Sequence, residues 1–308
     1  MSVDVEAAPP PPPPVELNEA ELTELTTRGS RERTASTTLA MRVWSAMWPK
    51  LLAVGIVLGI WELANLAKWK PDYVLPGPGA VFTRLWQELI GKPPGVGHEH
   101  TLLQELGKTM QRGLTGYGLA IVIGTVLGVA VVQWKTLRLA IGSLIAGLQT
   151  MPSIAWFPLA MAFFGLHDSA ILFVVILGAA PSVAAGVISG IDEVPPPLLR
   201  AGKMIGARGV NRYRYVVLPA AMPSYLSGLK QGWAFSWRSL LAGELLVPIG
   251  GGDSSLGGAL KYSGGVPNGK PWLLAIMIVI LVVGMVMDEI FGIFTRQIRN
   301  RRGLTGMA

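Results

Sequence analysis

Six apolar runs, each long enough or nearly long enough to cross a lipid bilayer, dominate this sequence of 308 residues. The hydrocarbon core of a bilayer requires about 20 apolar residues per helix. The runs cover residues 48–67, 113–132, 139–164, 170–188, 220–247 and 271–294. Charged residues make up only 15% of the chain, whereas a soluble domain typically contains about 25%. The sequence therefore predicts an all-α membrane protein with six transmembrane helices.

The distribution of basic residues predicts that both termini lie in the cytoplasm. If the N-terminus is inside, the segments on the cytoplasmic side contain 16 of the 26 Lys and Arg residues, and the segments on the outer side contain eight. Cytoplasmic segments of membrane proteins are enriched in basic residues. The remaining two, Lys230 and Arg238, lie inside the fifth predicted span. Membrane topology therefore explains the net charge of +7 without a nucleic-acid partner.

The chain is expected to have three parts. Residues 1–40 are predicted to be a disordered cytoplasmic tail, because the six consecutive prolines Pro9–Pro14 favour an extended polyproline helix without internal hydrogen bonds. Residues 41–300 are predicted to be the transmembrane domain, which includes a basic polar loop at 192–219. Residues 301–308 are predicted to be a cytoplasmic C-terminal tail.

The polar loop contains the most informative segment, Arg200–Pro219, which reads RAGKMIGARGVNRYRYVVLP. This segment is too polar to span a membrane and contains no acidic residue. Because glycine favours helix ends, Gly206 is predicted to terminate a short helix over residues 198–205. A second short helix is predicted to carry Tyr213 and Val216 toward the membrane. Its charge alone would suit an ordinary basic loop attracted to lipid headgroups.

The spacing within this segment resembles the EAA loop of the permease subunits of binding-protein-dependent ABC importers. That pattern is Glu-Ala-Ala, three residues, Gly, nine residues, Ile, one residue and Leu-Pro. The spacing matches throughout, with Arg200 in place of the glutamate, Gly202 in place of the second alanine and Val216 in place of the isoleucine. In that family the loop docks on a cytoplasmic ATPase subunit. The resemblance implies ATPase coupling by Arg200, Ala201, Gly202, Gly206, Val216, Leu218 and Pro219.

The resemblance extends over nearly all of residues 48–300. The segments that carry it are 74–89, 151–165, 228–246 and 287–302, and together they look most like the nitrate, sulfonate, taurine and bicarbonate branch. The resemblance implies a type I ABC importer permease fold in a bacterial plasma membrane and the import of a small anionic solute. The implied partners are two cytoplasmic ABC ATPase subunits, an extracytoplasmic solute-binding protein and a second copy of the permease in a homodimer.

The chain itself is predicted to lack an ATP site. A phosphate-binding loop needs Gly, four residues and Gly-Lys, followed by Ser or Thr. Gly264–Lys270 has this spacing, but Pro271 follows it. The chain is therefore expected to be a permease rather than an enzyme and to bind no cofactor, while the partner ATPase uses ATP and Mg²⁺. No catalytic or metal site is predicted, since His98 and His100 lack a third convergent ligand.

The third apolar run contains candidates for the solute path, because Pro152 and Pro158 break it. Backbone groups freed at such a break are tolerated beside protein or a water-filled cavity, and broken helices often mark the path in transporters. This pattern predicts path-lining roles for Thr150, Pro152 and Ser153. A simple packing kink would produce the same pattern.

The fifth apolar run contains two further path candidates, Arg238 and Glu244. Ionisable residues inside a membrane are costly and usually face the interior. These two lie about 120° apart around a helix, so each needs a partner elsewhere. Our hypothesis is that Arg238 attracts an oxyanion, which suits the guanidinium fork. The alternative is a structural ion pair between Arg238 and another helix.

Two other functions are alternatives to the importer hypothesis. The first is an ATPase-independent secondary transporter or channel, and the second is a membrane scaffold without a path. The sequence does not identify the solute, because importers of this kind take their specificity largely from the binding protein.

Overall fold

The computed structural model describes residues 39–71, 73–91, 101–247 and 255–301. All regular elements within these ranges are helices, as the sequence predicts. The chain divides into two compact units, Met1–Ala67 and Lys68–Ala308. Residues 1–38 of the predicted N-terminal tail and residues 302–308 of the predicted C-terminal tail lie outside the described residues.

The first unit contains one described helix, α2, at Leu39–Leu66. Its apolar stretch, Leu52–Leu66, covers most of the first predicted span. This stretch is shorter than the roughly 20 residues that cross a bilayer core. The structure therefore confirms a helix here, and its role as a span remains a prediction.

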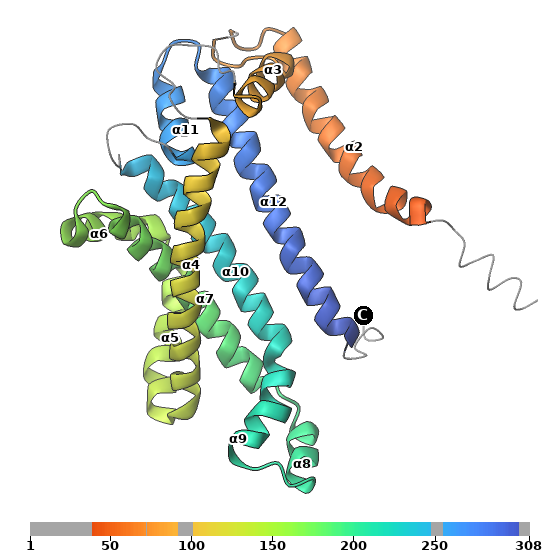
Figure 1. Cartoon of the computed structure of the whole chain (residues 1–308), viewed down its shortest axis with the longest axis vertical. Coiled ribbons are helices and arrows are strands. Elements are labelled where there is room, and N and C mark those ends of the chain that lie inside the picture. The colour runs from red at the N-terminus through yellow and green to blue at the C-terminus, as the bar shows by residue number, and fades with distance from the viewer. Residues whose placement is uncertain (1–38, 72, 92–100, 248–254, 302–308) are drawn as a thin grey trace, which may run out of the picture. The chain divides into compact units, whose positions relative to one another are not determined.

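The second unit contains every other described helix (Figure 1). These are α3 Pro78–Leu89, α4 Leu102–Gln133, α5 Lys135–Thr150, η1 Ser153–Trp156, α6 Phe157–Phe164, α7 Asp168–Asp192, α8 Pro196–Met204, α9 Gly209–Arg212, η2 Tyr213–Val217, α10 Leu218–Leu246, α11 Leu256–Gly265 and α12 Lys270–Arg301.

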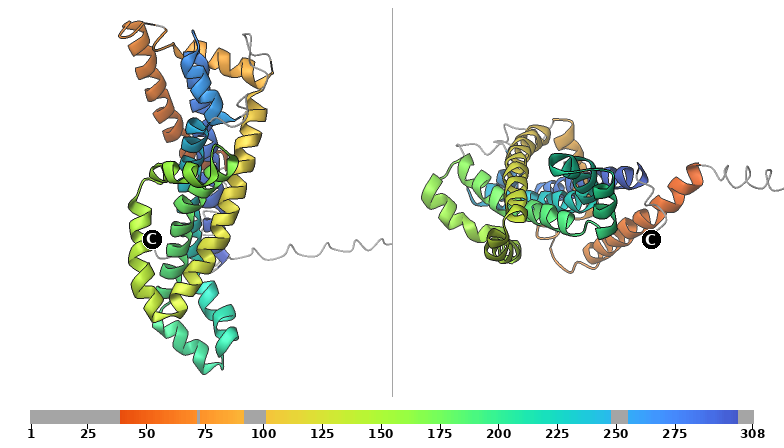
Figure 2. Two further views of the ribbon diagram at one scale, coloured as in Figure 1. Left: turned by 90° about the vertical axis from the view of Figure 1, so that its left-hand side faces the viewer. Right: turned by 90° about the horizontal axis from the view of Figure 1, so that it is seen from below.

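The centre of the second unit is α7, which packs against both α4 and α10 (Figures 1 and 2). Glycines occupy the points of closest approach between these helices. A Cβ atom on Gly124 of α4 would lie 2.5 Å from the carbonyl oxygen of Ala180, and one on Gly228 of α10 would lie 2.7 Å from the Cα atom of Gly186. In a membrane, close packing rather than hydrophobic burial drives helix association, so these small residues hold the unit together.

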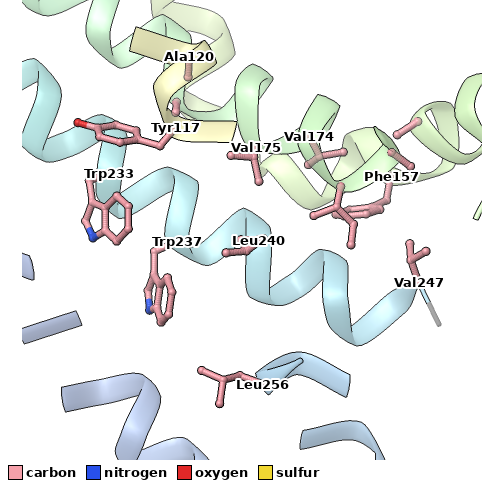
Figure 3. Close-up of a cluster of buried hydrophobic side chains, with 14 of the residues drawn as sticks. Tyr117, Ala120, Phe157, Val174, Val175, Trp233, Trp237, Leu240, Val247 and Leu256 are labelled. Carbon is pink, nitrogen blue, oxygen red and sulfur yellow. The ribbon is translucent and has the colours of Figure 1, made fainter. Parts of the chain in front are cut away.

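Aromatic side chains fill the space beside this crossing (Figure 3). The hydroxyl group of Tyr117 on α4 donates a hydrogen bond to the carbonyl oxygen of Leu229 at 2.7 Å. The Tyr117 ring also meets Trp233 edge-on, with 5.3 Å between the ring centroids. Trp233 in turn stacks on Trp237, with 6.0 Å between centroids and 17° between the ring planes. This cluster fixes the rotation of α10 against α4.

Within the described residues, three helices are long and apolar enough to cross a membrane, namely α4, α7 and α12. The pair of α5 with η1–α6 passes the same test if it counts as one broken span, and its two parts are bent by 104°. The remaining predicted span in this unit, α10, carries Lys230, Arg238 and Glu244. The predicted number of six spans is therefore not confirmed by length and composition alone.

The break in the third run lies at Pro152 rather than at both predicted prolines. Helix α5 ends at Thr150, and Pro152 precedes the short helix η1. Pro158 lies in the first turn of α6 and does not interrupt it. The first turn of a helix tolerates proline because its N–H groups have no intrahelical partner there. The prediction that Pro158 breaks the run is therefore wrong.

The segment between the first two predicted spans contains helical structure that was not predicted from the sequence. Helix α3 buries Val81 and Glu88. Burial raises the pKa of Glu88, and this effect is opposed by Arg84, whose guanidinium lies 2.7 Å from the carboxylate. Helix α4 begins at Leu102, well before the predicted start at residue 113. Thr101 caps α4 in a reciprocal capping box with Gln104, which explains the early start.

Candidate functional site

The basic loop folds into two short helices at the end of the second unit opposite α3 and α11 (Figures 1 and 2). Helix α8 ends at Met204 with Ile205 as its C-cap, and Gly206 follows with a φ of +83°, which agrees with the prediction that Gly206 terminates this helix. The N–H groups of Gly206 and Ala207 donate to the carbonyl oxygens of Lys203 and Gly202, at 3.2 and 3.0 Å. This pattern is a Schellman motif, in which a glycine in the left-handed region satisfies the last carbonyls of a helix.

The loop is closed by a contact between Gly202 and Val216, which are two of the predicted coupling residues. Gly202 is buried in α8, and Val216 is 8% exposed in η2. A Cβ atom on Gly202 would lie 2.8 Å from a methyl group of Val216. Both positions carry smaller side chains than the family pattern has there. The two departures from the pattern are therefore neighbours in space.

The tip of the loop projects apolar side chains that this chain does not cover. Met204, Ile205 and Val210 are 82%, 83% and 80% exposed. The basic residues around them, Arg200, Lys203, Arg208 and Arg212, are also exposed. Of the other predicted coupling residues, Ala201 and Leu218 are exposed and Pro219 is half-buried. The loop thus presents a mixed apolar and basic surface.

A π-helical turn, η2, joins the loop to α10. The N–H group of Leu218 donates to the carbonyl oxygen of Tyr213, five residues earlier. Pro219 accounts for this widened turn, because it has no N–H group and its ring would clash with the carbonyl oxygen of Tyr215 in a regular α-helix. Single π-helical turns within α-helices often occur at functional sites. The Leu-Pro pair of the pattern therefore sets the register between the loop and α10.

Four of the five predicted path residues line one cavity. Thr150, Pro152 and Ser153 from the break after α5 and Arg238 from α10 surround a volume of about 330 Å³. The hydroxyl group of Ser239 donates to the carbonyl oxygen of Phe235 at 2.7 Å and lies 2.6 Å from the Ser153 oxygen. Hydroxyl groups and a guanidinium thus converge where the third run is broken.

Arg238 is exposed on α10 and has no carboxylate partner within the described residues. Its Nε donates to the carbonyl oxygen of Ala234 at 3.1 Å, and its guanidinium lies 5.3 Å from the ring centroid of Phe235. The structural ion pair that we considered as an alternative is therefore absent from the described part of the chain. The role of Arg238 in binding an anion remains a prediction.

The fifth path candidate, Glu244, lies outside this cavity. Its side chain is buried, and it accepts hydrogen bonds from the Thr109 hydroxyl at 2.9 Å, from Arg112 at 3.3 Å and from the Gly257 N–H at 3.1 Å. Arg112 also lies 3.1 Å from Asp168 at the start of α7. We call the buried Glu244, its partners Thr109, Arg112 and Gly257, and the exposed Asp168 that Arg112 also contacts the buried carboxylate network. It joins α4, α7, α10 and α11.

The other members of this network were not predicted from the sequence. Thr109 and Arg112 lie three residues apart on α4 and precede the apolar part of that helix. The charge of Glu244 required a partner, but its position in the sequence gave no indication of which residue that is.

Comparisons with known proteins identify the family. Residues 120–300 match the family described as the binding-protein-dependent transport system inner membrane component. A putative ABC transporter permease protein of Methanocaldococcus jannaschii is 30% identical over 78% of this chain and 86% of that protein.

Two further relatives have named solutes. The taurine transport system permease protein TauC of Escherichia coli is 27% identical over 66% of this chain and 76% of that protein. The nitrate import permease protein NrtB of Leptolyngbya laminosa is 25% identical over 81% of this chain and 87% of that protein.

The fold has a solved counterpart in an inward-facing structure of the MetNI methionine ABC transporter. Its TM-score is 0.55 and its identity 18%, over 64% of this chain and 95% of that chain. The chain is therefore a multi-pass membrane protein that belongs to the family of binding-protein-dependent transport system inner membrane components.

Proposed function

We propose that this chain forms the translocation path of an ATP-driven importer for a small anionic solute and couples that path to a separate ATPase subunit. The surface at the tip of the basic loop carries the proposal. Met204, Ile205 and Val210 are each at least 80% exposed there, beside exposed basic residues. Exposed apolar side chains on a polar loop mark a protein or membrane contact, and the match to the spacing of the EAA loop favours a protein partner.

The connection between the loop and the membrane helices supports coupling. The loop leaves α7 at Asp192 and enters α10 through η2, so it connects the two helices that pack most extensively in this unit. The Gly202–Val216 contact and the Schellman motif at Gly206 make the loop a compact body rather than a loose tether. A force applied to the loop is therefore transmitted to the helix that carries Arg238.

An anionic solute is supported by the cavity at the break after α5. Its lining combines the guanidinium of Arg238 with the hydroxyl groups of Thr150 and Ser153. A guanidinium offers a planar set of donors that fits an oxyanion. Two relatives are named for taurine transport and nitrate import, and both of these solutes carry an oxyanion group.

The proposed assembly follows from the family. The six spans would be α2, α4, the α5–α6 pair, α7, α10 and α12, with both termini cytoplasmic. Two copies of the chain would form a homodimer, each docked on one ATPase subunit that uses ATP and Mg²⁺. A solute-binding protein would deliver the solute on the outer side.

Substitution of Gly206 tests the coupling. Gly206 has open space around it, so only its backbone conformation opposes a side chain. We expect Gly206→Val to abolish copurification of the ATPase subunit from the native host, because a β-branched residue strongly resists a positive φ. Gly206→Asn is the matched control and should retain the ATPase, since asparagine tolerates this region.

The competing functions predict a different result. If the wild-type chain copurifies with no ATPase subunit, the chain is a secondary transporter, a channel or a scaffold. If Gly206→Val retains both the ATPase and ATP-dependent transport in proteoliposomes, the loop does not couple.

A further inference from the structure

A second cavity lies between α10 and α12 and shares only Arg238 with the cavity at Thr150. Its volume of about 360 Å³ is at the small end of the roughly 300–1,000 Å³ range of ligand pockets. This volume suits a small solute rather than a large one. We call it the α10–α12 groove.

The α10 wall of the groove is rich in hydrogen-bond donors. Lys230, Trp233, Trp237 and Arg238 line it, at spacings that place them along one side of the helix. Trp233 and Trp237 extend from the same side of α10, with nearly parallel rings (Figure 3). The indole N–H of Trp233, a residue only 4% exposed, has no acceptor in the described part of the chain. An indole, an ammonium and a guanidinium can only donate, and they outnumber the two α10 side chains of the lining that can accept, Ser227 and Gln231. The wall therefore favours a ligand that offers acceptors.

The acidic group in the groove lining is Asp288 of α12, and it is already engaged. Its carboxylate lies 2.8 Å from the Lys230 ammonium. Both residues lie well inside their helices, and ionisable pairs at such positions in membrane proteins usually mark a solute or ion path. With Lys230 and Arg238 positive and Asp288 negative, the groove has an excess positive charge. A small anion that entered it would compete with Asp288 for Lys230.

The α12 wall leaves room for a ligand. Gly284 lines the groove, and a Cβ atom added to it would meet no atom within 4 Å. A larger side chain at this position would therefore fill the groove without displacing backbone.

We propose that the α10–α12 groove is a second oxyanion-binding station on the solute path, and that Lys230 exchanges Asp288 for the anion when the station fills. This inference rests on the proposed function, because it assumes that the solute is anionic. Arg238 would contact the anion in both cavities and so connect the two stations. The chemistry that the groove recognises is a sulfonate or nitrate group without donors of its own.

The experiment measures methanesulfonate binding to the full chain in phosphatidylcholine nanodiscs by isothermal titration. We expect Asp288→Asn to bind roughly fivefold tighter than wild type, or about 1 kcal/mol, because it frees Lys230 from a partly exposed pair. Gly284→Leu should weaken binding by at least about fivefold, because it fills the groove. Gly118→Leu is the matched control, because Gly118 of α4 also has open space around it but lies outside both cavities. This variant should bind methanesulfonate as tightly as wild type does.

Three results would overturn the proposal. If Asp288→Asn and Gly284→Leu bind as wild type does, while Arg238→Gln binds less, the Thr150 cavity holds the anion alone and the proposed function survives. If the wild-type chain binds neither methanesulfonate nor nitrate, the anionic part of the proposed function fails as well. If binding disappears in phosphatidylglycerol nanodiscs, the groove holds a lipid phosphate group rather than a free anion.

Discussion

Charged side chains at the two ends of the α7–α10 pair differ in exposure and in pairing. At the loop end, Arg200, Lys203 and Arg208 are exposed, and they make no ion pair within the described residues. At the other end, Glu244 is 2% exposed and accepts hydrogen bonds from α4 and from α11. The basic side chains of the loop tip thus remain available to a partner, whereas the carboxylate of Glu244 is satisfied within the chain.

This difference suggests a division of mechanical roles. Buried, fully paired polar groups make a structure rigid, because each one that loses its partner carries the cost of desolvation. An exposed surface can change partners at little cost. The buried carboxylate network therefore holds α4, α7, α10 and α11 in one arrangement, and the loop end remains available for docking. Substitutions at the two ends should separate stability from coupling.

The largest effect on stability is expected for Arg112→Met. This change leaves the buried carboxylate of Glu244 without its cationic partner, and such losses typically cost about 3–5 kcal/mol. We expect a strongly lowered melting temperature of the detergent-solubilised chain, measured by intrinsic fluorescence. ATPase association should fall only in proportion to the loss of folded protein.

A double substitution separates the charge from the packing. Arg112→Met combined with Glu244→Gln removes both charges and should recover much of the lost stability. If the double variant is no more stable than Arg112→Met, the network contributes through packing and not through its ion pair. The contrast between the two ends would then lose its electrostatic basis.

The sequence predicted the loop end far better than the network end. The helix end at Gly206 depends on local chemistry, because a glycine after a short helix is sufficient to predict it. The partners of Glu244 depend on the tertiary fold, since Thr109 lies 135 residues away and Arg112 lies 132 residues away. The break at Pro152 and the charge of Arg238 are both visible in the sequence. That four of the path candidates line one cavity was not predicted, because it depends on how α5 and α10 pack.

A smaller effect is expected for Pro219→Ala, which should raise stability and lower transport. The new N–H group could bond to the carbonyl oxygen of Tyr215, which would convert η2 into a regular α-helix. We expect stability to rise by about 1 kcal/mol, while the loop rotates by about 100° relative to α10, the angle of one helical residue. ATP-driven transport in proteoliposomes should therefore fall, although the melting temperature rises. An unchanged transport rate would show that the register set by η2 does not matter for coupling.

The smallest effect on stability, and the clearest contrast with Arg112, is expected for Ile205→Ser. Its side chain is 83% exposed, so the folded chain gains almost nothing from it. Exposed positions away from special features usually change stability by no more than about 0.5 kcal/mol. If a partner buries Ile205, the substitution would nevertheless weaken the free energy of binding by roughly 1.5–3 kcal/mol, because that apolar contact is lost. Copurified ATPase should then fall by about tenfold or more, at an unchanged melting temperature. Ile60→Ser, at a position of α2 that is 63% exposed, is the control that should retain the ATPase. Equal ATPase yields from the two variants would mean that the exposed tip of the loop is not a docking surface.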